Sequence, residues 1–154
     1  GVVSTLAGSE AGFRDGSAQS ALFNSPVDVA VDAGGRIYIA DMANQRVRLL
    51  AGGVVSTFAG GREAGTRDGH VGEARFHWPQ GVAVSADDVF VSDTFSHRLR
   101  RIHGARVTTL AGSDAGYGDS PAPPRFNYPW GVAVSGGVLY VADRNNERIR
   151  RIYF

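Results

Sequence analysis

Residues 126–152 read FNYPWGVAVSGGVLYVADRNNERIRRI, and this stretch decides the fold because the chain repeats it. The similar runs FNSPVDVAV and FHWPQGVAV begin at Phe23 and Phe76. They are followed by IYIAD and VFVSD, which end at Asp41 and Asp93 as LYVAD does in the quoted stretch. Repetition at a fixed period is typical of proteins that stack one structural unit several times. The chain therefore contains three copies of one unit.

A second motif recurs with nearly the same spacing. VSTLAG begins at Val3, VSTFAG at Val55 and VTTLAG at Val107, each 52 residues after the one before. The chain has 154 residues, enough for one domain with a sizeable core. We therefore interpret it as a single domain, 1–154, with repeats at about 1–53, 54–105 and 106–154.

Each unit contains four short runs in which apolar and polar residues alternate, as in β-strands. Gly, Pro, Asp and Asn separate the runs and indicate turns. Because the connections are short, neighbouring strands must be antiparallel, which gives a four-stranded meander. In the first unit we expect strands at 27–31, 37–40, 46–50 and 54–59, and the run 3–7 has the pattern of a further outermost strand.

The composition is that of an ordinary globular protein, with 43% hydrophobic and 20% charged residues. The net charge of +1 provides no overall field that would attract nucleic acid or an anionic membrane. Cysteine is absent, so disulfides and thiolate metal sites are excluded. No apolar run approaches the ~20 residues of a membrane-spanning helix. The first residue is not Met, which suggests a processed chain or part of a longer protein, and no targeting segment assigns a compartment.

A repeated four-stranded unit of about 50 residues is typical of a β-propeller blade. The phrase P-x-G-V-A-V, Y-V-A-D, N-x-R-I-R resembles the NHL repeat, and the loop AGFRDG followed by A-x-F-N-x-P resembles the long-loop NHL repeats of multidomain proteins. The resemblance extends over the whole chain. The first unit departs from it at Asp28, where the repeat has Gly, and the second at Ser96 and His97, where Asn-His is common. Neither departure alters the predicted all-β propeller fold.

Three blades are too few for a closed ring, since propellers typically have 4–8. A row of three would expose two apolar blade faces and one strand edge. We therefore expect a homodimer with twofold symmetry that closes a six-bladed ring, in which the strand at 3–7 of each copy completes the last blade of the other. The alternative is that the chain is half of a longer six-bladed domain.

Residues that recur in all three units are interpreted as architecture. An Asp ends the second strand of each unit and an Arg begins the third, so these side chains are expected to form a partly buried ion pair. The alternatives are a ring of acidic metal ligands or a basic stripe for nucleic acid. The expected pairs are Asp41 with Arg46, Asp93 with Arg98, and Asp143 with Arg148.

Positions that differ between units are free to serve function. In a meander, the loop before the first strand and the loop between the second and third strands emerge on one face. Aromatic loop tips are enriched at interfaces and suit stacking on a sugar ring or a peptide. The alternative is that the tryptophans fill gaps between blades. The predicted ligand-binding residues are His77, Trp78, Tyr128 and Trp130 from the first set of loops, and Met42, Phe95, Arg144 and Asn145 from the second.

Few residues could take part in metal or nucleophilic chemistry. Three His, or two His and a carboxylate, commonly hold a catalytic zinc. His77 and His97 fall on one face of one blade, and Asp28 and His77 lie where a ligand of a central cation would project, so these three are the metal candidates. No Ser-His-Asp arrangement or phosphate-binding glycine motif has supporting context. We assign no catalytic residue and no cofactor, apart from a possible divalent cation in the central channel.

The leading interpretation is a non-enzymatic scaffold that recognises a protein, peptide or glycan on its loop face, as the resemblance to NHL propellers implies. The alternative is a metal-dependent lyase or hydrolase, since some similar six-bladed rings hold a cation in their channel. A third is RNA binding, which some NHL proteins show but which needs a basic face that is missing here. The expected partners are a second copy and a protein, peptide or glycan ligand, with no nucleic acid and no membrane.

Overall fold

The computed structural model describes residues 1–154 and consists of short strands and three single turns of 3₁₀ helix. None of its helical segments is long and apolar enough to cross a membrane. The elements, in chain order, are β1 (Gly16–Ser17), β2 (Pro26–Val31), β3 (Ile37–Asp41), η1 (Met42–Asn44), β4 (Arg46–Ala51), β5 (Val54–Gly60), β6 (Gly69–His70), β7 (Pro79–Ser85), β8 (Asp88–Asp93), η2 (Thr94–Ser96), β9 (Arg98–His103), β10 (Arg106–Gly112), β11 (Pro129–Ser135), β12 (Val138–Asp143), η3 (Arg144–Asn146) and β13 (Arg148–Tyr153).

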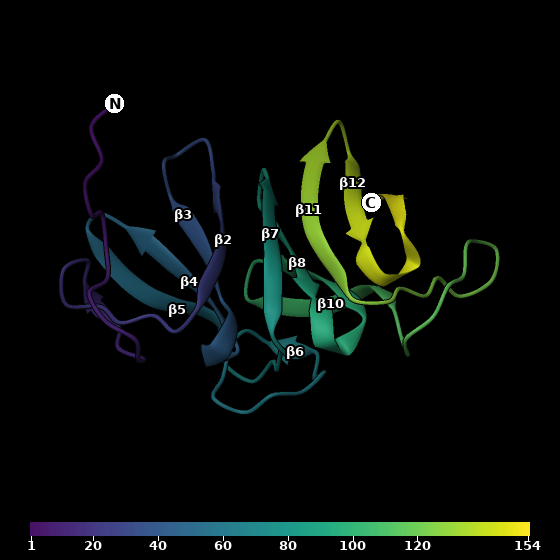
Figure 1. Cartoon of the computed structure of the whole chain (residues 1–154), viewed down its shortest axis with the longest axis horizontal. Helices are drawn as coiled ribbons and strands as arrows, with labels where there is room; N and C mark the ends of the chain where they lie inside the picture. Colours follow the sequence, from purple (N-terminus) through teal and green to yellow (C-terminus); the bar gives the residue numbers. More distant parts are fainter.

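The strands form three antiparallel sheets that stand in a row like blades (Figure 1). The first has the order β1-β5-β4-β3-β2, the second β6-β10-β9-β8-β7, and the third β11-β12-β13. Innermost strands lie side by side, with β7 between β2 and β11. The four strands expected in the first unit are confirmed as β2 to β5, because alternating apolar residues separated by tight turns form a meander.

The core lies between the blades and repeats the same packing at each interface. Val47 on the first sheet is buried in a cluster with Phe76 and Val91 of the second. Leu99, at the equivalent position of the second sheet, is buried with Phe126 and Val141 of the third. Each blade is a single sheet, so it depends on the neighbouring blades to cover its apolar faces.

The two outermost strands, β1 and β6, are too short to be recognised from alternation in the sequence. β1 pairs with β5, and β6 pairs with β10, through two residues each. Both come from the long loop that precedes the innermost strand of their sheet. These strands cover one end of the outer edge of a blade, where backbone groups would otherwise be unpaired.

The strand expected at 3–7 is not formed in the single chain. Val2 and Val3 are almost fully exposed, and the nearby backbone bond is that of the Gly8 N–H to the Ala18 carbonyl, 2.9 Å. At the other end of the row, β13 has no neighbour on its outer side, and Ile149 is 77% exposed. A strand requires a partner for its backbone groups, and this chain offers none within reach of residues 2–7. The six-bladed dimer stays a prediction.

Candidate functional site

Buried Asp–Arg ion pairs recur in each blade, but the predicted arginine was wrong. Asp41 Oδ2 is 2.6 Å from Nη1 of Arg48, not of Arg46. Arg46 lies directly opposite Asp41 in the ladder, yet its guanidinium donates to the Asn44 carbonyl and stacks over Phe13. Arg48 is two residues further along the strand and therefore lies diagonally across from Asp41, a distance that an arginine side chain can span. The corrected pairs are Asp41 with Arg48, Asp93 with Arg100, and Asp143 with Arg150.

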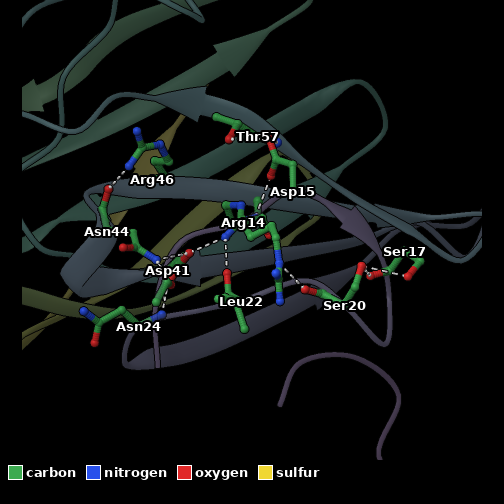
Figure 2. Close-up of polar contacts among 12 residues, drawn as sticks. Arg14, Asp15, Ser17, Ser20, Leu22, Asn24, Asp41, Asn44, Arg46 and Thr57 are labelled. Carbon is green, nitrogen blue, oxygen red and sulfur yellow. Dashed lines mark hydrogen bonds and ion pairs between the residues drawn. The ribbon is translucent and has the colours of Figure 1, made fainter. Parts of the chain in front are cut away.

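Each of these arginines ties the long loop to the sheet. In the first blade, the buried Arg48 guanidinium bonds Asp41, Asp15 and the carbonyls of Leu22 and Arg14. These four partners are labelled in Figure 2. Asp15 in turn accepts from the N–H and hydroxyl of Thr57, at 3.1 Å each. The recurring polar residues therefore hold the fold together, as their recurrence suggests.

The same carboxylates position the loops that carry the variable residues. Asp93 Oδ1 accepts from the backbone N–H of His77 at 2.6 Å, while its other oxygen binds Arg100. Burial raises the pKa of Asp93 to about 6, although Arg100 and the His77 N–H favour its charged form. Asp41 and Asp143 accept in the same way from Asn24 and Asn127. The loop before each innermost strand is thus anchored to a buried charge.

Two aromatic loop tips have a left-handed backbone and are held by the preceding blade. Trp78 has φ +52° and Tyr128 has φ +53°, which is strained for bulky residues. The Trp78 N–H donates to Gln45 Oε1 at 2.7 Å, and the Tyr128 N–H donates to His97 Nδ1 at 3.1 Å. Gln45 was missed in the sequence, although it occupies the same repeat position as His97. These bonds orient the aromatic side chains before any ligand arrives.

Three aromatic rings and two imidazole rings form a continuous row on the loop face. The Trp78 ring centroid lies 4.5 Å from that of Phe95, and Phe95 lies 4.9 Å from Tyr128 in an edge-to-face arrangement. The His97 ring lies 4.7 Å from Tyr128, and the His77 ring lies 5.5 Å from Phe95. We call these five residues the aromatic row. It spans the second and third blades and joins both sets of predicted loops.

The remaining predicted residues lie on either side of this row. Arg144 is 4.6 Å from the Trp130 ring, and both line an open pocket of the third blade. Hydroxyls of the second blade bond the carbonyls of Pro129 and Trp130. Asn145 in η3 donates its N–H to the Asn127 carbonyl, and Met42 lies in η1 of the first blade. Trp78 and Trp130 are each 39% exposed, so neither is a buried filler between blades in the single chain.

The family model described as NHL repeat matches residues 23–48 and 126–152, which are the first and third units. These two units are therefore similar to the NHL repeat. The second unit, where Ser96 and His97 depart from the expected residues, lies outside both matched segments.

The relatives of this chain are much longer than it is. NHL repeat-containing protein 2 of Gallus gallus is 40% identical over 91 residues, which are 56% of this chain and 12% of that protein. A solved auxiliary nutrient binding protein of Bacteroides thetaiotaomicron has a TM-score of 0.71 and 24% identity, over 80% of this chain and 36% of its own. A structural genomics protein of unknown function from the same organism has a TM-score of 0.71 and 27% identity, over 77% and 32%. These likenesses show a propeller-like fold.

The metal candidates of this chain do not assemble into a site. No group of three or more His, Asp or Glu side chains lies close enough to hold an ion. The Asp28 carboxylate accepts from the N–H groups of Val29 and Val82. His97 uses Nδ1 to accept from Tyr128, and His77 packs against Phe95. The donor set of one chain therefore does not fit the three-ligand centre considered from the sequence.

Acid is expected to loosen the joint between the second and third blades. Burial, with a smaller contribution from Arg98, lowers the pKa of His97 below its usual value of about 6.5. Only the neutral ring can accept from Tyr128. Between the lowered pKa and 6.5 the unfolded chain binds the proton more tightly, so stability is lost as the pH falls through this range. Urea unfolding between pH 8 and 5 should show a loss of at most about 1 kcal/mol from this joint, the net value of one hydrogen bond.

The control for this effect is His97→Gln, which reproduces the amide acceptor that Gln45 provides one blade earlier. The difference in unfolding free energy between the two proteins should widen as the pH falls below 6.5. An unchanged difference over the whole range would show that the His97 ring does not accept this bond.

Proposed function

We propose that the loop face is a non-covalent binding site for a protein, peptide or glycan, with the aromatic row, Trp130 and Arg144 as its contact residues. The observation that carries the proposal is the pair of left-handed residues, Trp78 and Tyr128, each held by a hydrogen bond from the blade before. Folding has already fixed the strained backbone that presents these rings. Binding therefore costs less side-chain and loop entropy than it would for mobile aromatic tips.

The chemistry of the face favours a ligand with flat apolar surfaces and an acidic or hydroxyl group. Aromatic rings stack on sugar rings and on peptide side chains at low entropic cost. Arg144 lies over Trp130 and presents donors that suit a carboxylate or a hydroxyl. The fold-level likeness to nutrient-binding proteins supports a binding role of this kind.

Substitution of Trp130 or Arg144 by alanine is expected to weaken ligand binding at least about tenfold, as for a contact worth ~1.4 kcal/mol. The ligand would first be selected from defined oligosaccharides and from a peptide library by the change in tryptophan fluorescence. Dissociation constants would then be measured by calorimetry. Arg106→Ala is the matched control, because Arg106 is an exposed arginine on the hairpin at the opposite end of the second blade. Unchanged affinity in both Trp130→Ala and Arg144→Ala would overturn the proposal.

A further inference from the structure

Residues 2–8 read VVSTLAG and have the character of an outer strand without a sheet. β5 reads VVSTFAG and β10 reads RVTTLAG. The segment also ends like them, since Gly8 has φ +89° where Gly60 has +98° and Gly112 has +96°. The backbone at Gly8 is therefore already that of the end of an outer strand.

The third sheet lacks the strand that residues 2–8 resemble. β4 and β9 each pair with an outer strand, whereas β13, their equivalent, ends its sheet. In the complete blades Arg48 is opposite Thr57 and Arg100 is opposite Thr109. The same register would place Thr5 opposite Arg150 and Val3 opposite Ile152.

A polar contact that the complete blades make is missing in the third. Asp15 and Asp68 each bond the buried arginine of their blade and also the N–H and hydroxyl of a threonine on the outer strand. Asp119 bonds Arg150 in the same way, but no threonine stands beside it. Thr5 is the residue that would fill this position.

The two open apolar faces also match. Leu99 is fully buried against Phe126, Leu139 and Val141, while its equivalent Ile149 is 77% exposed. At the other end of the row, an apolar pocket of the first blade is open to solvent. Its lining includes the equivalents of the three residues that cover Leu99, namely Phe23, Ile37 and Ile39.

A hydrogen bond joins the loop tips of successive blades. At the two ends of the row, the third blade has an acceptor position without a donor and the first blade has a donor position without an acceptor. Gln45 and His97 accept from the N–H of the left-handed residue in the next blade. Glu147 occupies the acceptor position in the third blade and is exposed. Ser25 occupies the donor position in the first blade, with φ +52°. Glu147 would accept from the Ser25 N–H across a joint between the two ends.

These two ends cannot meet within one chain, because the second sheet stands between them (Figure 1). We propose that a second copy supplies the missing parts, with residues 2–8 of each copy as the outer strand on β13 of the other. The interface is isologous, so the same joint forms twice and closes a ring of six blades. The occupant is a second copy because the strand, the apolar pocket and the hydrogen-bond donor that β13 and its blade lack are all present and unused in the same chain.

The test is the mass of the purified chain, measured by size-exclusion chromatography with light scattering. The total chain concentration would run from about 1 to 100 μM, a range of dissociation constants that covers transient and stable dimers. We expect twice the mass of one chain. Ser4→Pro removes an N–H and disfavours strand pairing, and Ile149→Asp places a charge in the apolar pocket. Each should raise the dimer dissociation constant by about a hundredfold or more, whereas Ser4→Ala and Ile149→Val should leave it within a few-fold.

The chain has no cysteine, so the register can be tested directly by an engineered disulfide. Cysteines at Ser4 and Arg151, which the register places opposite each other, should give a covalent dimer on oxidation. Cysteines at Thr5 and Arg151 would point to opposite faces and should not. A monomer mass at every concentration, a dimer insensitive to Ser4→Pro and Ile149→Asp, or equal cross-linking by both cysteine pairs would overturn the proposal. Circular dichroism checks that the Ile149→Asp variant still folds. Ser4 lies outside every sheet of the single chain, so Ser4→Pro should leave the fold of that chain unchanged.

Discussion

Replacement of Arg100 by methionine is expected to lower the free energy of unfolding by about 3–5 kcal/mol. The Arg100 guanidinium is fully buried and donates to Asp93 at 2.7 Å, to Asp68 at 2.6 Å and to two loop carbonyls. Methionine fills most of the same volume, so the loss would come from the Asp93 carboxylate, which would stay buried without its counter-charge. Urea unfolding at one fixed protein concentration measures the effect and keeps any contribution from self-association constant.

Arg98→Met is the matched control for Arg100→Met. Arg98 is on the same strand and is half-buried, but its guanidinium donates only to the Ser96 carbonyl. Its replacement should cost less than about 1 kcal/mol. If the two variants lost similar stability, the diagonal pair would not be the contact that holds the second blade together. Because Asp93 also holds the His77 N–H, Arg100→Met should in addition alter the fluorescence of Trp78.

Gly112→Ala is expected to cost about 2–5 kcal/mol, the sum of backbone strain and a steric clash. Gly112 has φ +96°, and a Cβ atom there would lie 2.3 Å from the His97 carbonyl oxygen and 2.9 Å from the Arg98 Cα. The residue follows the register shift, a β-bulge, between Thr109 and Ala111. The backbone would have to move to accept the methyl group.

Gly104→Ala is the control for Gly112→Ala, because it separates the cost of backbone strain from the cost of the steric clash. Gly104 also has a positive φ, +54°, but a Cβ atom there would meet nothing within 4 Å. Its replacement should cost about 1–2 kcal/mol, the usual penalty for a left-handed alanine. Thermal or urea unfolding of both variants gives the comparison. A cost at Gly112 no larger than at Gly104 would mean that the outer strand yields easily at this bulge.

The fold could be predicted because its information is local and is repeated three times. Alternation within VDVAV and IYIAD specifies strands, and the short turns between them leave only an antiparallel meander. The partner of Asp41 could not be predicted in this way. Arg46 and Arg48 are on the same face of one strand, and only the position of the long loop, with Asp15 and Phe13, decides which guanidinium turns inward.

The residues of the candidate site could be predicted from the sequence, but the hydrogen bonds that position them could not. Variation between equivalent loop positions indicated Trp78, Phe95 and Tyr128, and the structure brings these three together. The hydrogen bonds from Gln45 and His97 depend on how one blade is placed against the next, which no single unit encodes. Residues 3–7 failed to form the expected strand for a related reason, since a strand's partner is a property of its surroundings.

The central position of β7 bears on how the molecule moves. β7 is buried for most of its length, because β2 and β11 flank it, while those two strands are largely exposed. In a row of stacked units, the end units open first and the middle unit is protected by both neighbours. Four members of the aromatic row, His77, Trp78, Phe95 and His97, are carried by this middle unit. In the single chain these four rings are therefore on the part that is slowest to open, and fraying at either end of the row would leave them in place.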